Sequence, residues 1–369
     1  MSDEPAEGVI LFAQVNRFSN TNDALEAALK RHLPGTELRI YRAYPAIRKN
    51  PVLLTACLLA VLWSYGPKAA FDPKSINQRL IKTPFFFWLA SRLVRRQARA
   101  TPGLRAVLQT QGLFNGKTDR LPLFIYTDNT LLNRINGVVT KSPILAQEKV
   151  LYRDADYIGV SASHVVTSLI EDYGVAPTVP ENVLIGANSP VPKDAGEARY
   201  RSGRILFVGI DWERKGGPEL VAAFRRVVRK FPEARLTIAG SKPEIADLPQ
   251  ATALGKIPPE KVGELMREAC LYCMPSHIEP SSVAVVEAAS SGLPIVATAV
   301  GGFLDSVKDG ETGLLVPPGD VEALADALER LLADPELCAR YGRAGQALMK
   351  QFRWDTVSAK LAAGMTARL

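Results

Sequence analysis

Two glutamates, eight residues apart, are the side chains in this sequence best placed to do chemistry. Glu279 follows the apolar run Leu271–Met274, which predicts a strand. Glu287 lies in the apolar segment Ser282–Ser291, which predicts a helix. A carboxylate in an apolar run is costly unless hydrogen-bond donors reach it, and the hydroxyl groups of a bound sugar or ribose are such donors. The alternative is structural: Glu287 pairs with a neighbouring base, and Glu279 is solvated.

The start of the predicted helix offers a second kind of site. Backbone N–H groups in the first turn of a helix have no partner within it, and they form a favourable environment for an anion such as a phosphate. In this sequence those amides belong to Ser281, Ser282 and Val283. We therefore expect a phosphate-binding helix start directly after Glu279.

A loop with two cations and two glycines follows another apolar run, Arg204–Val208. The loop begins at Gly209 with the sequence GIDWERKGG and contains Arg214 and Lys215. Cations aimed at a leaving diphosphate stabilise its developing charge without a metal ion. The alternative is a solvated surface loop, in which adjacent Arg and Lys side chains are common.

Strands and helices alternate through the second half of the chain, which predicts a parallel sheet covered on both faces. The predicted strands are Arg204–Val208, Arg235–Ala239, Leu271–Met274, Pro294–Thr298 and Gly313–Val316. The predicted helices are Glu219–Lys230, Lys261–Cys270, Ser282–Ser291 and Glu322–Leu332. Ligands of such sheets bind beyond the carboxyl ends of the strands, where both motifs described above lie.

The first half is similar but less regular, and its alternation breaks down between Tyr44 and Arg105. Its predicted strands are Val9–Gln14, Glu37–Tyr41, Ala106–Thr110, Leu123–Thr127, Tyr157–Ser161 and Asn182–Ile185, with helices at Asp23–His32 and Ser163–Tyr173. We expect an N-terminal domain over residues 1–190, a linker over 191–203 and a second domain over 204–353. We expect residues 354–369 to form a C-terminal helix that packs back on the N-terminal domain.

Four motifs in this order make residues 204–353 resemble the donor-binding domain of the family 4 glycosyltransferases, within group 1. They are FVGIDWERKGG (207–217), EPSSVAVVE (279–287), ASSGLPIVATAVGG (289–302) and DGETGLLVPPGD (309–320). The resemblance implies the α/β GT-B fold, with two doubly wound Rossmann-like domains facing a central cleft. It also implies a retaining transferase that moves a sugar from a nucleotide diphosphate donor, a UDP- or GDP-sugar, without a metal or another cofactor.

The resemblance also implies roles for the matching residues. Arg214 and Lys215 would hold the diphosphate together with the amides of Ser281, Ser282 and Val283. Glu287 would bind the ribose hydroxyls, and Glu279 would act at the transferred sugar as the catalytic residue of the donor side. Further residues expected to line the donor site are Gly209, Gly255, Ile257 and His277. The N-terminal domain would bind the acceptor, a glycan or a lipid-linked sugar.

Three departures from the family pattern bear mainly on the acceptor side. The family's Gly-Gly loop is replaced after the first strand by QVNRFSN, in which Arg17 or the Asn20 amide is the candidate phosphate contact. The acceptor-side His is missing from YTDNT (126–130), where Asp128 is either a base or only a turn-former. Ile210 stands where many members have Arg. The alternative function is therefore a non-catalytic or donor-hydrolysing GT-B protein of a glycan-assembly complex.

The formal net charge of +7 belongs to the first half of the chain. The window Leu38–Thr118 holds 14 basic residues and a single acid, Asp72. Within residues 46–105, the apolar run Val52–Trp63 is shorter than the roughly 20 residues that span a bilayer, and Phe85–Arg99 mixes aromatic side chains with arginines. This pattern favours an interfacial region on anionic lipid. The alternatives are a domain core with a solvated basic face and, more weakly, a nucleic-acid surface.

Other features exclude function classes. Four cysteines in 369 residues do not make a disulfide scaffold, and the pair Cys270 and Cys273 lies in an apolar run that predicts buried thiols rather than a zinc site. The sequence has no P-loop or GxGxxG motif of an ATPase or nicotinamide enzyme. The acidic, polar N-terminal segment is unlike a secretory signal, so we expect a cytoplasmic protein at the inner face of a membrane.

Overall fold

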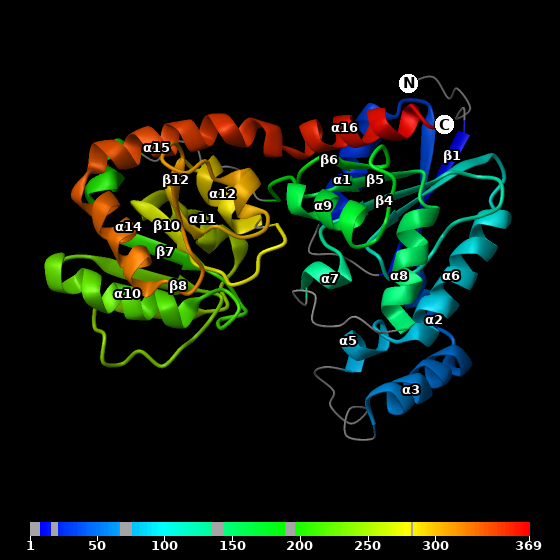
Figure 1. Ribbon diagram of the computed structural model, residues 1–369, viewed down its shortest axis with the longest axis horizontal. Coiled ribbons are helices and arrows are strands. Elements are labelled where there is room, and N and C mark those ends of the chain that lie inside the picture. The colour runs from blue at the N-terminus through cyan, green and yellow to red at the C-terminus, as the bar shows by residue number, and fades with distance from the viewer. Residues whose placement is uncertain (1–7, 16–20, 67–75, 135–142, 189–195, 282) are drawn as a thin grey trace. The chain divides into compact units, whose positions relative to one another are not determined.

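A computed structural model of the chain describes residues 8–15, 21–66, 76–134, 143–188, 196–281 and 283–369 (Figure 1). The chain divides into two compact units. The first unit comprises Met1–Leu184 and Val357–Leu369, and the second unit comprises Ile185–Thr356. Each unit contains a six-stranded sheet whose paired strands are all parallel, which confirms the predicted α/β class with two doubly wound sheets.

The sheet of the first unit has the strand order β2-β1-β3-β4-β5-β6. Its strands are β1 (Gly8–Gln14), β2 (Thr36–Arg42), β3 (Leu104–Thr110), β4 (Leu123–Thr127), β5 (Tyr157–Val160) and β6 (Pro180–Asn182). Every residue of β1, β4 and β5 is buried, as expected of parallel strands covered on both faces. The last strand was predicted at Asn182–Ile185, but β6 ends at Asn182. Beyond that residue the regular pairing with β5 stops, because the amides of Val183 and Leu184 both donate to the Val160 carbonyl.

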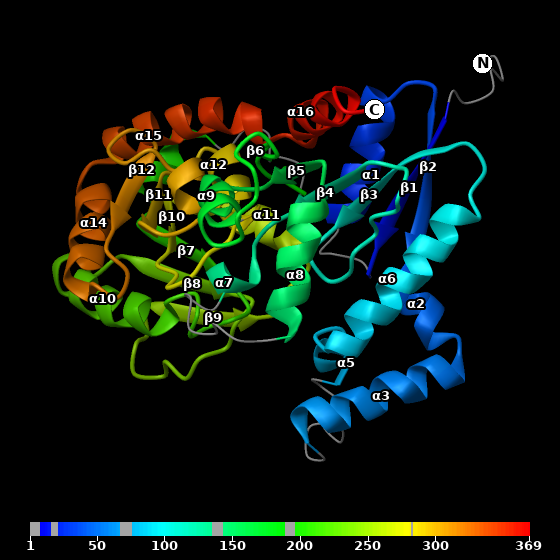
Figure 2. The ribbon, with the colours of Figure 1, turned by 45° about the vertical axis from the view of Figure 1, so that its right-hand side comes forward.

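Helices fill the stretch in which the strand–helix alternation breaks down. The helices of the first unit are α1 (Thr21–His32), α2 (Ala43–Arg48), α3 (Pro51–Tyr65), α5 (Ile76–Leu80), α6 (Pro84–Arg99), α7 (Leu131–Arg134), α8 (Pro143–Asp154) and α9 (Ser163–Glu171). Asn50 caps α3 by accepting from the Val52 and Leu53 amides at 3.1 and 3.2 Å, and Thr83 caps α6 in the same way. Figure 2 shows α3 at the edge of the first unit, where it packs on α2, α5 and α6.

The two apolar runs of this stretch differ in how deeply their side chains are buried. On α6, the residues Phe86, Phe87, Leu89, Ala90 and Val94 are buried in the core of the first unit. For this face of α6, the interpretation as domain core is correct. On α3, only Cys57 and Val61 are buried.

The sheet of the second unit has the strand order β12-β11-β10-β7-β8-β9. Its strands are β7 (Arg204–Val208), β8 (Arg235–Ala239), β9 (Ala251–Gly255), β10 (Leu271–Met274), β11 (Ile295–Thr298) and β12 (Gly313–Val316). Strand β9 was not predicted, because ATALG is short, contains a polar residue and lies at the edge of the sheet, where its side chains stay partly exposed.

The helices of the second unit cover this sheet. They are η1 (Glu197–Arg201), α10 (Gly217–Lys230), α11 (Pro259–Glu268), α12 (Val283–Ser290), α13 (Phe303–Ser306), α14 (Val321–Ala333), α15 (Pro335–Leu348) and η2 (Met349–Phe352). Helix η1 falls within the segment expected to be a linker, and its Arg199 and Tyr200 are buried. The Arg199 guanidinium donates to the Ser291 carbonyl at 2.7 Å, so this segment packs on the second unit.

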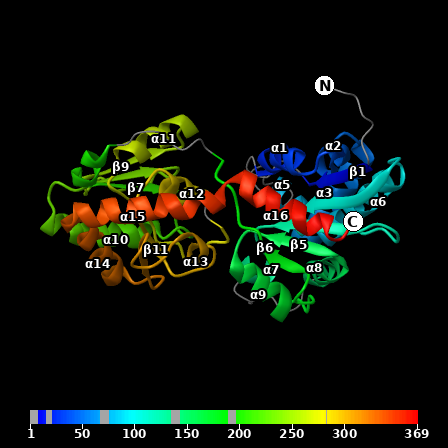
Figure 3. The ribbon, with the colours of Figure 1, turned by 90° about the horizontal axis from the view of Figure 1, so that it is seen from above.

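The last helix, α16 (Trp354–Thr366), contributes its residues from Val357 onward to the first unit. Figure 3 shows α16 alongside β5 and β6. A Cβ atom on Gly364 would lie 2.2 Å from the Tyr157 ring, so only a glycine permits this close approach. The Arg368 guanidinium stacks 4.7 Å from the centre of the same ring and donates to the Thr178 carbonyl at 2.9 Å.

Candidate active site

Strands β7 and β10 are neighbours in the second sheet and place two loops at the same edge. Because the strands are parallel, with Ile205 opposite Leu271, their carboxyl ends meet. The loop 209–216 follows β7 and leads into α10, and the segment 275–281 follows β10 and leads toward α12. The two polar motifs of the sequence therefore come from adjacent strand ends of one sheet.

Backbone contacts tie these two segments together. Gly216 has a φ of 71°, and a Cβ atom there would lie 1.9 Å from the Pro275 carbonyl oxygen. The His277 amide donates to the Arg214 carbonyl at 2.9 Å. The position of the cations of the first segment is thus fixed against the residues just before Glu279.

Glu279 and Lys215 form a buried ion pair at this edge. The Lys215 ammonium group contacts Glu279 Oε2, and the side chains are 13% and 4% exposed, respectively. The Ser276 hydroxyl donates to the same oxygen at 3.3 Å, and Arg214 Nη1 lies 3.8 Å from it. The solvated alternative for Glu279 is therefore wrong: the carboxylate is buried, and cations and a hydroxyl surround it.

Arg214 is held separately on the more exposed side of this pair. Its Nε donates to Asp211 Oδ2 at 2.8 Å, and its Nη1 donates to the Ile278 carbonyl at 2.8 Å. About a third of the side chain remains exposed. A guanidinium that is fixed by two acceptors and still partly exposed is suited to bind an oxyanion.

Glu287 lies on α12, and its side chain is partly exposed. Burial raises the pKa of Tyr272 well above its usual value, and the carboxylates of Glu279 and Glu287 raise that pKa further. Both carboxylates are therefore close enough to act electrostatically on one buried tyrosine of β10. The Val283 amide is in the first turn of α12 and Ser281 is two residues before it, whereas Ser282 lies outside the described residues.

The residues expected to line the donor site occupy the neighbouring strand ends. The Gly209 carbonyl accepts from the Ser241 hydroxyl at 2.6 Å, and the Gly255 carbonyl accepts from the Gly240 amide at 2.7 Å. Ile257 follows β9 and is half-buried. His277 Nε2 lies 3.0 Å from Glu219 Oε1 on α10, so this imidazole is oriented by Glu219. Gly209, Gly255 and His277 thus occupy one edge of the sheet.

On the acceptor side, the structure describes one of the three predicted residues. Arg17 and Asn20 lie outside the described residues. Asp128 follows β4 at the carboxyl edge of the first sheet and is half-buried. Burial raises the pKa of Tyr126 and the Asp128 charge raises it further, so the carboxylate lies near this buried phenol.

A buried carboxylate behind Asp128 was not predicted from the sequence. Glu148 on α8 accepts from the Leu131 amide at 3.1 Å and from the Tyr173 hydroxyl at 2.5 Å. The Leu132 amide donates to the same tyrosine oxygen at 3.2 Å. Glu148 and Tyr173 thus hold the start of α7, three residues beyond Asp128. The surrounding sequence, QEKV, is typical of an exposed helix face and gives no signal of this role.

Truncation of Glu148 should therefore be costly. We expect Glu148→Ala to lower the free energy of unfolding by about 2–4 kcal/mol, because it leaves the Leu131 amide and the Tyr173 hydroxyl without their acceptor in a buried site. Urea unfolding followed by circular dichroism measures this loss. Glu171→Ala, at an exposed position of α9, is the matched control and should change little. A loss below about 1 kcal/mol for Glu148→Ala would show that the network does not hold α7.

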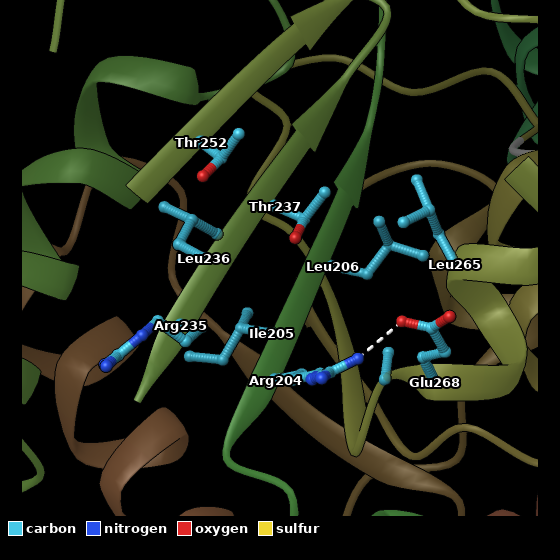
Figure 4. Close-up of a pocket in the computed structure, with 10 residues that line it drawn as sticks. Arg204, Ile205, Leu206, Arg235, Leu236, Thr237, Thr252, Leu265 and Glu268 are labelled. Atoms are coloured by element: carbon cyan, nitrogen blue, oxygen red, sulfur yellow. Dashed lines mark hydrogen bonds and ion pairs between the residues drawn. The ribbon is translucent and has the colours of Figure 1, made fainter. Parts of the chain in front are cut away.

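Two further features lie apart from these strand ends. Cys270 and Cys273 are buried free thiols, as predicted, and burial raises the pKa of Cys270 to about 12. A pocket of about 230 Å³ lies between α11 and the strands β7–β9 (Figure 4). It is lined by Arg204 and Arg235 from the amino ends of their strands, and Arg204 forms an ion pair with Glu268 there. This pocket therefore does not belong to the candidate active site.

Comparison with known proteins covers both halves of the chain. The family described as "Glycosyl transferases group 1" matches residues 195–348. The phosphatidyl-myo-inositol mannosyltransferase of Mycobacterium leprae is 34% identical over an alignment of 192 positions, which covers 50% of this chain and 51% of that protein. The D-inositol 3-phosphate glycosyltransferase of Acidothermus cellulolyticus is 30% identical over an alignment of 304 positions, which covers 71% of this chain and 67% of that protein. The chain thus spans about half the length of the first of these relatives.

Solved structures match nearly the whole chain. A sucrose-phosphate synthase from Thermosynechococcus elongatus has a TM-score of 0.69 at 21% identity and covers 98% of both chains. HepE of Anabaena, in complex with UDP and glucose, has a TM-score of 0.67 at 16% identity, covering 98% of this chain and 100% of its own. At these identities the likeness establishes the fold alone, which is that of the GT-B glycosyltransferases.

Proposed function

Because this chain belongs to the group 1 glycosyltransferases, we propose that it transfers a sugar from a UDP- or GDP-sugar to a glycan or lipid-linked acceptor at a membrane surface. The transfer proceeds with retention of configuration and without a metal ion. One observation carries the proposal: Lys215, Arg214 and the buried Glu279 converge at the carboxyl ends of β7 and β10, inside the segment that the family matches.

The geometry supports a division of roles at the donor. Lys215 and Arg214 bind the diphosphate, whose negative charge grows as the bond to the sugar breaks. Glu279 accepts hydrogen bonds from hydroxyl groups of the transferred sugar, while Glu287 accepts those of the ribose. The bond from the sugar's anomeric carbon to the diphosphate breaks, and a bond to the acceptor oxygen forms on the same face. The acceptor proton goes to the leaving phosphate.

The curated relatives suggest which acceptors to test first. The names of two relatives contain inositol, one as a phospholipid and one as a phosphate. A phosphatidylinositol acceptor would place the reaction at a membrane surface, which the basic window of the first half also favours. Among the described residues, no helix has both the length and the apolar character needed to cross a bilayer.

A screen of donors and acceptors tests the proposed function. The full chain is incubated with UDP- and GDP-sugars, with inositol phosphates or phosphatidylinositol vesicles as acceptors, and the products are separated by mass spectrometry. We expect one donor to give a glycosylated product whose anomeric configuration, read by NMR, is that of the donor. Release of free sugar with water as the only acceptor would instead support donor hydrolysis. Absence of nucleotide binding by calorimetry would support a non-catalytic protein.

Removal of metal ions should leave the reaction intact. We expect transfer in EDTA to stay within about twofold of transfer with Mg²⁺, because Lys215 and Arg214 supply the positive charge that a metal would otherwise bring to the diphosphate. The measurement is the initial rate of nucleotide release after dialysis against EDTA. A loss of about tenfold or more that Mg²⁺ or Mn²⁺ restores would contradict a metal-free mechanism.

A further inference from the structure

We propose that α3 lies in the plane of an anionic lipid bilayer, with the stripe Val52–Leu59–Trp63 inserted among the acyl chains. This inference rests on the proposed function, which places the acceptor at a membrane surface. It assigns membrane contact to one helix and to one face of that helix.

The composition of α3 is unusual for a helix on the surface of a protein. None of its 15 residues is charged, yet only Cys57 and Val61 are buried. Val52 is 74% exposed, Leu59 is 60% exposed and Trp63 is 93% exposed. Large apolar side chains exposed together on one helix mark a contact with a membrane or with another protein.

The three exposed side chains lie on one line. Val52, Leu59 and Trp63 are separated by seven and then four residues, so on a helix they point within roughly 20° of one direction. Cys57 and Val61, which helical spacing puts on the opposite side, are buried, and α3 packs on α2, α5 and α6 (Figure 2). At about 22 Å the helix is too short to cross a bilayer but long enough to lie within its interface.

The positive charges around α3 favour anionic lipid as the partner of the exposed stripe. Arg48 and Lys49 are exposed just before the start of α3, and Lys82 is exposed at its other end, where the Tyr65 hydroxyl donates to the Lys82 carbonyl at 3.3 Å. The helices α2, α3, α5 and α6 contain no acidic residue. An apolar stripe with cations at both ends complements an anionic bilayer, in which the cations reach the headgroups.

A second copy of this chain fits the same surface less well. In a symmetric dimer through α3, the stripe of one chain would pack on the stripe of the other. The cations at the ends of the two helices would then lie close to one another and repel. The same argument disfavours any strongly basic protein partner. An anionic lipid surface satisfies both the apolar stripe and the charges.

Flotation with lipid vesicles tests this inference on the full chain. The vesicles contain phosphatidylcholine with about 30% phosphatidylglycerol. We expect the double substitution Leu59→Ser and Trp63→Ser to lower the partition coefficient by at least about tenfold, because polar side chains replace the inserted ones. Leu304→Ser on α13 of the second unit is the matched control, since Leu304 is 50% exposed and should not contact lipid. Wild-type protein should bind pure phosphatidylcholine more weakly.

Insertion also has a spectroscopic signature. Brominated acyl chains should quench part of the tryptophan fluorescence of the wild-type protein, and Trp63→Phe should remove most of that quenching.

The inference would be overturned if the double variant floated with the vesicles as well as the wild type does. The inference would also be overturned if sedimentation showed the wild type to be a dimer and the double variant a monomer, while both proteins bound vesicles equally well. If the wild-type protein floats but transfers no sugar, only the proposed function fails. If the wild-type protein transfers sugar and the double variant floats as well as the wild type, only this inference fails.

Discussion

Replacement of Lys215 by methionine is expected to lower the rate of sugar transfer by about 100- to 1,000-fold, because it removes a preorganised cation at the site of the leaving diphosphate. Glu279→Gln is expected to cause a loss of similar size, because the carboxylate accepts from the sugar hydroxyls more strongly than an amide does. Initial rates with a saturating nucleotide sugar measure both effects. Lys261→Met, at an exposed ion pair on α11, is the matched control and should retain the wild-type rate.

The double variant separates a catalytic role from a structural one. Either single substitution removes one member of the buried ion pair, which by itself can cost about 3–5 kcal/mol of stability. Lys215→Met combined with Glu279→Gln removes both charges, so thermal stability should largely recover while transfer stays low. Recovery of transfer together with stability would show that the ion pair only supports the fold. Near-wild-type rates in the single variants and in Glu287→Ala would contradict the assignment of the donor site.

Gly216→Ala is expected to disrupt the site by a backbone effect. The added Cβ atom would lie 1.9 Å from the Pro275 carbonyl oxygen, and the φ of 71° is itself unfavourable for alanine. The loop that carries Arg214 and Lys215 must then move away from the end of β10. We expect a loss of about 3 kcal/mol in the free energy of unfolding and loss of nucleotide binding. Urea unfolding and calorimetry with UDP and GDP measure the two effects.

Gly263 provides the control for this substitution. It lies within α11, and a Cβ atom there would have no heavy atom within 4 Å. Gly263→Ala should therefore stabilise the chain slightly, by about 0.5–1 kcal/mol. If Gly216→Ala behaves in the same way, the contact between the loop and Pro275 does not fix the cations.

The donor half was predictable because local patterns determine it. Short apolar runs alternate with helical segments, and parallel strands then bring the loops that follow them to one edge of the sheet. The strand order of such a sheet therefore predicts that Arg214, Lys215 and Glu279 lie at one edge. It did not show that Lys215 and Glu279 contact each other, because side-chain pairing between loops 64 residues apart leaves no periodic signal.

The first half was less predictable for physical reasons. Glu148 is an acidic residue in a polar helical segment, and its burial depends on Tyr173 and the start of α7, which are distant in sequence. The helices α3 and α6 both contain long apolar runs, yet most of the apolar side chains of α6 enter the core, whereas on α3 only Cys57 and Val61 are fully buried. Hydrophobicity alone does not distinguish these outcomes, because the packing of neighbouring helices decides them.

The return of the chain to its first unit has a consequence for synthesis. The second unit is a single continuous segment, Ile185–Thr356, so all of its strands are available once the ribosome has passed α15 and η2. The first unit includes Val357–Leu369, whose Gly364 and Arg368 pack on Tyr157 of β5. That side of the N-terminal sheet therefore stays uncovered until Val357–Leu369 have left the ribosome. Although it is translated first, the first unit is completed last.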